Sequence, residues 1–229
     1  MSNQLEGRQR IVAIDGPSGV GKSTVSRCLA AELGFTYLDT GAMYRAVAYG
    51  CERAGVDVED EAAVAELLEN MHIQLLPPVP GGDDVCVLLN GEDIGIFIRT
   101  PEMGMLASKV SAQQAVRAKL TAMQQDLGKN GSLVAEGRDI GTVVFPNASW
   151  KFYLDASPEE RARRRVAQLQ EKGQIVDEGE LLAQIIKRDQ DDRERKMAPL
   201  ARAEDAVLVD SSSLNVDGVV ARMLEVVRQ

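Results

Sequence analysis

The segment 16–24 has the sequence GPSGVGKST, which matches the phosphate-binding pattern G-x-x-x-x-G-K-[ST]. An apolar run at 11–15 precedes it, and apolar residues at helical spacing follow it. Strand, glycine-rich loop and helix therefore occur in the order that the pattern requires. A glycine-rich turn before a core helix would explain the glycines but not the Lys22-Ser23 pair. The segment predicts a loop that binds a nucleoside triphosphate.

Each part of this loop has a predicted role. The glycines let the backbone curve so that successive N–H groups point at the phosphates, and the helix N-terminus adds partial positive charge. Lys22 is expected to reach the β- and γ-phosphates, and the Ser23 hydroxyl to bind Mg²⁺ as the single predicted metal ligand. The predicted ATP-binding residues are Gly16, Pro17, Ser18, Gly19, Val20, Gly21, Lys22, Ser23 and Thr24.

Length, charge and cysteine spacing restrict the remaining possibilities. A chain of 229 residues suits one substantial domain with an inserted subdomain. Its net charge of −9 gives no basic field for nucleic acid. Three widely spaced cysteines and a single histidine favour neither a zinc site nor a disulfide framework. The polar N-terminus and the lack of a membrane-length apolar stretch lead us to expect a soluble, cytoplasmic protein.

Five short segments rich in Val, Ile, Tyr and Phe predict a parallel sheet, because helical stretches separate most of them. The segments are 11–15, 35–39, 133–136, 151–155 and 206–210. We therefore expect a three-layer αβα fold of the P-loop NTPase type with a five-stranded parallel sheet. Such sheets bind ligands beyond the C-terminal ends of their strands. The phosphate-binding loop, Thr40 and the segment 137–139 follow the first three strands in that way.

Residues 40–132 are too many for one crossover between the second and third strands. The pattern predicts helices at 47–54 and around 64–71, and a helix from Val116 to Leu127 that Gly128 closes. It also predicts a small antiparallel sheet from 72–76, 85–89 and 96–99, with a Pro/Gly-rich break at 77–82 and a turn at Asn90-Gly91. We interpret approximately 40–128 as an inserted substrate-binding region, although a decoration far from the site also fits this pattern.

Two later segments concentrate arginine in an acidic chain. Ser157 and Pro158 predict a helix start, and Arg161, Arg164 and Arg165 then share one helix face. This predicts a short lid at approximately 157–176 over the donor phosphates, with a solvated helix paired to Glu as the alternative. On a second helix at about 180–196, Arg188, Asp192 and Arg195 share a face. Both a ligand site and an intrahelical ion-pair ladder fit that spacing.

Together these residues resemble the nucleoside monophosphate kinases, and within them the bacterial cytidylate (CMP/dCMP) kinases. The resemblance extends over nearly the whole chain through IDGPSGVGKST at 14–24, LDTGAMYR at 38–45, IRTPE at 98–102, EGRDIGTVVFP at 136–146, FYLDASPEERARRR at 152–165, LQEKG at 169–173 and RDQDDRERKMAPL at 188–200. It implies a single kinase domain over 1–229, with the inserted region binding the monophosphate, the lid closing over ATP and the remainder forming the core. It also favours a monomer.

The resemblance implies a role for each matching residue. Arg45, Arg138 and Arg195 would hold the acceptor phosphate; Thr40, Arg117 and Asp139 would bind cytosine; Ser108, Arg188 and Asp192 would hold the ribose; and Tyr44 would complete the CMP site. Lys22, Arg138, Arg161, Arg164, Arg165 and Arg195 would be the catalytic residues. This chain has Thr40 where the family usually has Ser, and Glu136 where Asp is usual.

The implied reaction is transfer of the ATP γ-phosphoryl group to CMP or dCMP, with Mg²⁺, in pyrimidine nucleotide metabolism. The acceptor is a phosphate with a second pKa of about 6, so no catalytic base is required. Two rival interpretations are a kinase that acts on an alcohol with Asp139 as base, and a nucleotide-dependent switch that regulates a partner.

Overall fold

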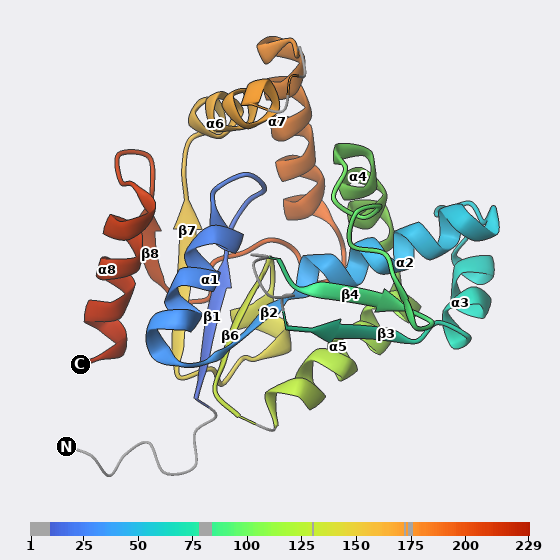
Figure 1. Ribbon diagram of the computed structural model, residues 1–229, viewed down its shortest axis with the longest axis horizontal. Helices are drawn as coiled ribbons and strands as arrows, with labels where there is room; N and C mark the ends of the chain where they lie inside the picture. The colour runs from blue at the N-terminus through green and yellow to red at the C-terminus, as the bar shows by residue number, and fades with distance from the viewer. Residues whose placement is uncertain (1–9, 78–83, 130, 172, 174–175) are drawn as a thin grey trace. The chain divides into compact units, whose positions relative to one another are not determined.

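The computed structural model describes residues 10–77, 84–129, 131–171, 173 and 176–229 (Figure 1). The predicted polar N-terminus, residues 78–82 of the predicted break and parts of the predicted lid lie outside the described residues. The described chain forms two compact units, one of which is Leu38–Asp126 and the other the remainder. Each unit is described by itself below.

The main sheet has five strands in the order β2-β6-β1-β7-β8. Its strands are β1 (Ile11–Asp15), β2 (Thr36–Asp39), β6 (Leu133–Gly137), β7 (Trp150–Asp155) and β8 (Val207–Asp210). The pairs β1–β6, β1–β7 and β7–β8 are parallel, and Ile14 lies opposite both Glu136 and Phe152. Each predicted strand is confirmed to within one residue at either end. The predicted three-layer fold class is therefore confirmed.

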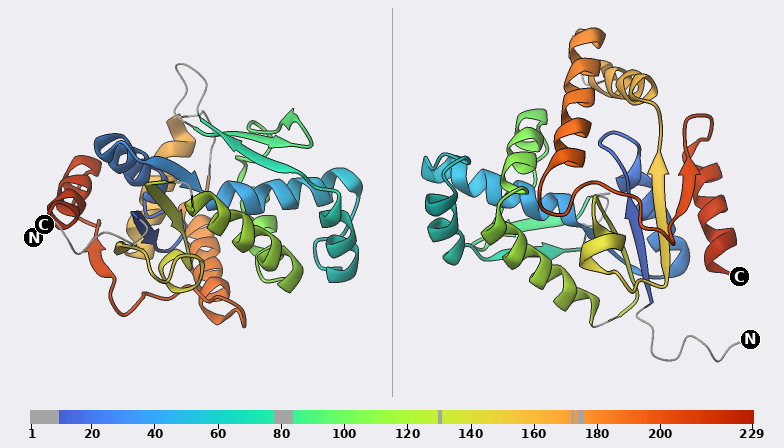
Figure 2. Two further views of the ribbon diagram at one scale, coloured as in Figure 1. Left: turned by 90° about the horizontal axis from the view of Figure 1, so that it is seen from below. Right: turned by 180° about the vertical axis from the view of Figure 1, so that it is seen from behind.

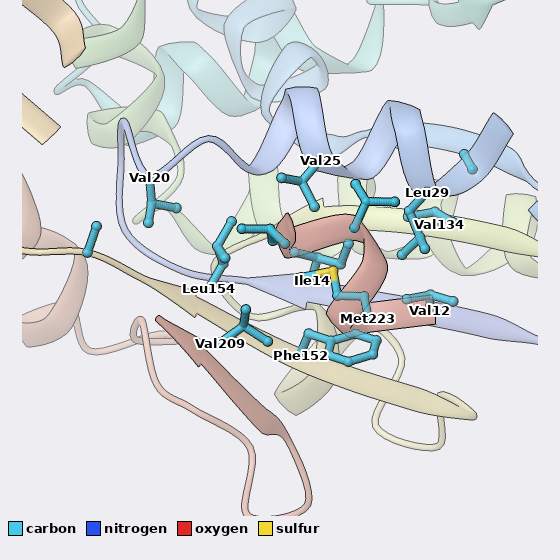
Figure 3. Packing of buried hydrophobic residues seen from close by; sticks show 14 residues of the cluster. Val12, Ile14, Val20, Val25, Leu29, Val134, Phe152, Leu154, Val209 and Met223 are labelled. Carbon is cyan, nitrogen blue, oxygen red and sulfur yellow. The ribbon is translucent and has the colours of Figure 1, made fainter. Parts of the chain in front are cut away.

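Side chains of the central strands alternate between the two faces of this sheet. Val12 and Ile14 enter a cluster with α1 (Lys22–Leu33) and α8 (Val216–Val227), which lie side by side (Figures 2 and 3). On the opposite face, Asp15 meets the backbone of a π-helical turn, η1 (Ile140–Val144). Because both faces are covered, these strands are continuous apolar runs.

Two helices after β7 pack against each other, namely α6 (Pro158–Glu171) and α7 (Glu178–Glu194) (Figure 1). The prediction of a helix start at Ser157 is confirmed, since its hydroxyl accepts a hydrogen bond from the Glu160 N–H at 3.2 Å. The second helix begins and ends two residues before the predicted bounds of 180 and 196. Within the described part of the chain, we find no helix with both the length and the apolar character that a membrane crossing demands.

The Leu38–Asp126 unit contains helices and a small antiparallel sheet. Its elements are α2 (Thr40–Ala54), α3 (Glu61–Glu69), β3 (Ile73–Leu76), β4 (Cys86–Leu89), β5 (Glu92–Asp93), α4 (Pro101–Val110) and α5 (Gln114–Gly128), the last of which continues past the end of the unit. Helix α2 starts earlier than predicted because the Asp39 side chain caps it, accepting from the Ala42 N–H at 3.0 Å.

The prediction of a strand at 96–99 is wrong. The third strand of the small sheet is β5, directly after the turn at Asn90-Gly91, and residues 95–99 form turns. The physical reason is local: the Asp93 carboxylate accepts from the Gly95 N–H at 2.9 Å, which bends the chain out of the sheet. Helix α4, with Thr100 as its cap and Pro101 in its first turn, follows at once.

We expect replacement of Phe152 by Ala to lower the free energy of unfolding by about 3–5 kcal/mol, because Phe152 is buried in the centre of the α1–sheet–α8 cluster. Urea unfolding measures this loss. Leu208→Ala on the adjacent strand is the control, since Leu208 is 50% exposed and should cost less than about 1 kcal/mol. Equal losses in the two variants would contradict this placement of the core.

Candidate active site

The phosphate-binding loop starts where β1 ends and passes directly into α1 (Figure 1). Gly16 has φ +153°, and a Cβ atom there would lie 2.1 Å from the carbonyl oxygen of Leu154 on β7. The first glycine of the motif is therefore required both by its backbone conformation and by the closeness of the neighbouring strand. This contact fixes the start of the loop against the sheet.

Side chains and backbone N–H groups bind most of the loop's carbonyl oxygens. Lys22 Nζ donates to the carbonyls of Gly16 (2.8 Å) and Pro17 (2.7 Å), Arg161 to that of Ser18 (2.9 Å), Ser211 Oγ to that of Val20 (3.4 Å), and the Val25 N–H to that of Gly21 (3.1 Å). An anion must be bound by N–H groups, so a loop whose carbonyls are already engaged is suited to phosphate.

The Lys22 ammonium is buried, with 6% of the residue exposed. Burial and, next, the charge of Arg138 lower the pKa of Lys22 well below its usual value, while the carboxylates of Glu136 and Asp15 oppose that shift. A bound polyphosphate would bring negative charge to this point and favour the protonated form. Lys22 thus lies where the predicted donor phosphates would stabilise its charge.

Asp15 was not among the predicted site residues, yet it organises the segment that carries two of them. Its carboxylate accepts from the Ile140 N–H and the Gly141 N–H, both at 2.8 Å. These bonds hold the start of η1, immediately after Arg138 and Asp139. Burial raises the pKa of Asp15 to about 6, although the two backbone hydrogen bonds act in the opposite direction. A buried acid at the end of an apolar strand is the sequence signal for this role.

Four predicted acceptor-site residues form two ion pairs between the turn after β6 and the end of α7. Arg138 Nε donates to Asp192 at 2.9 Å, and Arg195 Nη2 donates to Asp139 at 3.3 Å. Arg195 also donates to the Ala198 carbonyl at 2.6 Å. The structure therefore pairs the predicted phosphate ligand Arg138 with the predicted ribose ligand Asp192. It pairs the predicted phosphate ligand Arg195 with the predicted cytosine ligand Asp139.

The charges around Asp192 keep it ionised. Burial would raise the pKa of the Asp192 carboxyl, but Arg138, Arg188 and Arg195 outweigh burial and hold that pKa below its usual value. Arg138, which lies on a different segment, donates a hydrogen bond to Asp192. This pairing crosses between segments, from the turn after β6 to α7.

Glu136, the residue that departs from the family pattern, is buried at the end of β6. Its carboxylate accepts a hydrogen bond from the Tyr37 hydroxyl on β2. The same carboxylate contributes to the field at Lys22. The longer Glu side chain therefore has a partner within the sheet and stands near the donor loop.

The three predicted lid arginines on α6 have different surroundings. Arg161 is buried and bound to Asp189, whereas Arg164 donates to Glu160 (2.8 Å) and to the Ser211 carbonyl (2.5 Å). Arg165 donates to Gln168 at 3.3 Å. The alternative prediction, a solvated helix whose arginines pair with Glu, describes part of α6, because Glu160 binds both Arg163 and Arg164. Asp189 and Ser211 were missed by the sequence analysis, since nothing local marks them as partners of distant arginines.

The remaining predicted CMP ligands belong to the Leu38–Asp126 unit. Arg117 is buried, its guanidinium lies 5.8 Å from the centre of the Tyr44 ring, and it donates to the Ser111 carbonyl at 3.3 Å. Thr40 is buried at the start of α2, and Arg45 and Ser108 are half-buried on α2 and α4, which pack together. Tyr44 and Arg117 are thus neighbours within this unit.

The donor set around the loop fits Mg²⁺ that binds together with nucleotide phosphates. In such sites Mg²⁺ takes one or two protein oxygens and completes its shell with phosphates and water. Ser23, in the first turn of α1, is an exposed residue. Across residues 10–229, leaving aside those not described, no three His, Cys, Asp or Glu side chains form a self-contained metal cage.

The parallel sheet, the loop with its carbonyls engaged and the adjacent cluster of guanidinium groups define a P-loop phosphotransferase. The family model for cytidylate kinase matches residues 12–229. The chain belongs to the cytidylate kinase family, which confirms the resemblance in its motifs.

Relatives and solved structures agree with this placement. The chain is 50% identical to the cytidylate kinase of Syntrophotalea carbinolica over 97% of this chain and 93% of that protein. It is 46% identical to the cytidylate kinase of Pasteurella multocida over 100% of this chain and 97% of that protein. The fold is similar to that of an uncharacterized protein from Eubacterium ventriosum, with a TM-score of 0.53 at 12% identity, covering 96% and 99% of the two chains.

We expect the stability contribution of Asp15 to depend on pH. Its folded pKa of about 6 lies above the reference value of 3.8, so the contribution is complete below pH 3.8 and is lost as the pH rises through 6. The loss amounts to about 3 kcal/mol. The measurement is the difference in free energy of unfolding between the wild type and D15N, which lacks this titration, from about pH 4 to 7. A difference independent of pH would contradict the raised pKa.

Proposed function

We propose that this protein transfers the γ-phosphoryl group of ATP to CMP or dCMP, giving ADP and CDP or dCDP. Membership of the cytidylate kinase family supports this reaction. The single observation that carries the proposal is the cluster of Arg138 and Arg195 with Asp139 and Asp192. A nucleotide-binding switch needs one anion site, whereas a phosphotransferase to a monophosphate needs a second set of guanidinium groups.

The donor residues position and neutralise ATP. The backbone N–H groups of 16–24 would bind its phosphates. The Lys22 ammonium would leave the Gly16 and Pro17 carbonyls and reach the γ-phosphoryl group that is transferred. Ser23 would hold Mg²⁺, which supplies charge neutralisation of the polyphosphate when bound. Arg161, Arg164 and Arg165 would support the donor site from α6. No residue has to act as a base, because the acceptor phosphate is mostly ionised at pH 7.

The acceptor residues bind the monophosphate by its three parts. Arg138, Arg195 and Arg45 would hold its phosphate, and Arg188, Asp192 and Ser108 its ribose. Asp139, Arg117, Thr40 and Tyr44 would bind the base, since a carboxylate can accept from the cytosine N4 amine. Catalysis would come from placing two polyanions in line and stabilising the charge that spreads between them. We propose residues 40–128 as the monophosphate-binding region and 157–176 as the lid.

We also propose that the enzyme is a cytoplasmic monomer. The three cysteines are free thiols, which suits a reducing compartment.

A coupled assay of ADP release across CMP, dCMP, UMP and AMP tests the proposed reaction. We expect CMP or dCMP to give the highest kcat/KM. UMP should be poorer by roughly 5- to 150-fold, because losing one buried base contact costs about 1–3 kcal/mol. Slow ATP hydrolysis with no stimulation by any monophosphate would contradict the proposal and favour the switch.

Replacement of Arg195 by Ala is expected to raise the KM for CMP and to lower kcat, because a charged contact with the CMP phosphate is lost. The affinity for ATP should change little, because Arg195 belongs to the proposed acceptor site. A contact of this kind contributes about 2–4 kcal/mol, or roughly 30- to 1,000-fold in kcat/KM. Steady-state kinetics with each substrate varied separates the two effects. Arg193→Ala is the matched control, since Arg193 lies two residues away and is exposed. An unchanged CMP profile in the R195A variant would remove Arg195 from the site.

A further inference from the structure

We propose that Arg161 and Asp189 form a positioning pair, which holds the phosphate-binding loop and α7 in a fixed relation so that donor and acceptor phosphates meet in line. The inference rests on the proposed function and deepens it. The sequence predicts Arg161 as part of a lid over the donor phosphates. Its surroundings instead indicate that it acts through the loop.

The pair is buried and has two-point geometry. Arg161 Nη2 lies 2.5 Å from Asp189 Oδ2, and Arg161 Nη1 lies 3.2 Å from Asp189 Oδ1. The exposed fractions of the two side chains are 1% and 3%. A guanidinium bound in this way to a carboxylate has a fixed orientation as well as a fixed position. Arg161 therefore lacks the solvent freedom that a closing arginine needs.

The remaining donors of Arg161 connect two further segments. Its Nε donates to the Ala156 carbonyl at 3.0 Å, just after β7, and its Nη1 donates to the Ser18 carbonyl at 2.9 Å. One side chain thus joins the phosphate-binding loop, the end of β7 and α7. The Ser18 bond gives that loop carbonyl a partner on α6.

Asp189 connects this junction to the acceptor site through its own helix. It lies one residue after Arg188 and three before Asp192, so it shares a single turn of α7 with two proposed ribose ligands. Asp192 in turn binds Arg138, a proposed phosphate ligand. A rigid path therefore runs from the donor loop through Arg161, Asp189 and one helical turn to the acceptor arginine. A misplacement of about 1 Å along such a path can cost about 100-fold in rate.

A purely structural role is the competing explanation, and the energetics of buried ion pairs separate the two. Replacing both members of such a pair by apolar residues of similar volume is often neutral or stabilising, whereas removing one member leaves an uncompensated charge. A double apolar variant can therefore remain folded while losing all the directed hydrogen bonds of Arg161.

The experiment compares the wild type, R161M/D189L and the control D191N. Asp191 is an exposed neighbour on α7 that pairs with Lys187, so its replacement tests the helix without the pair. We expect R161M/D189L to unfold within a few degrees of the wild type. Its kcat with ATP and CMP should fall by about tenfold or more, while its Kd for ATP alone should change by less than about threefold. D191N should match the wild type in all three measurements.

Wild-type turnover of CMP tests the proposed function. The ratio of the kcat of R161M/D189L to that of the wild type tests the role of the Arg161–Asp189 pair. A wild type inactive on CMP contradicts the proposed function. A folded R161M/D189L protein with kcat within twofold of an active wild type overturns the positioning role. If the double variant does not fold, D189N supplies the decision, because it keeps the shape of Asp189. The same tenfold loss of kcat supports the pair, and a lowered Tm with unchanged kcat overturns it.

Discussion

A phosphate-binding loop depends on the direction in which its peptide groups point. A peptide unit whose N–H faces an anion has its carbonyl turned elsewhere, where other groups can bind it. In this protein the carbonyls of Gly16, Pro17, Ser18 and Val20 bind Lys22, Arg161 and Ser211. Much of the surrounding structure serves this arrangement: β7 supports Gly16, α6 supplies Arg161, and the segment after β8 supplies Ser211. The loop that carries the motif is therefore only the inner part of a larger arrangement of side chains within this unit.

The sheet and the donor loop could be predicted from the sequence because their signals are local. Apolar runs such as Ile11–Asp15 mark buried parallel strands, and the loop has a spacing that few other structures use. The small sheet was predicted less well. A strand of two residues such as Glu92–Asp93 is too short to show the alternation of apolar and polar side chains by which strands are predicted. The Asx turn at Asp93 then directs the chain out of the sheet.

Partners of buried charges could not be predicted from the sequence. Helical spacing placed Arg161 and Arg164 on one face, but it could not show that Arg161 binds Asp189, 28 residues away, or that Arg164 reaches Ser211, 47 residues away. Such pairs are made by the packing of whole elements. The same limit applied to Asp15, whose carboxylate accepts hydrogen bonds from the N–H groups of the distant residues Ile140 and Gly141. Motifs in the sequence identify candidate site residues, but their long-range hydrogen-bond partners are visible only in the folded structure.

The crossed pairs Arg138–Asp192 and Arg195–Asp139 have a consequence for ligand selection. Within these two pairs, two positive and two negative side chains balance one another, so the pairs together carry no net charge. An uncharged nucleoside that used the proposed sugar and base ligands would have to separate buried opposite charges with nothing to replace them. A dianionic group can take the place of both carboxylates at once. Under the proposed function, the site would therefore favour compounds that carry their own negative charge over cytidine itself.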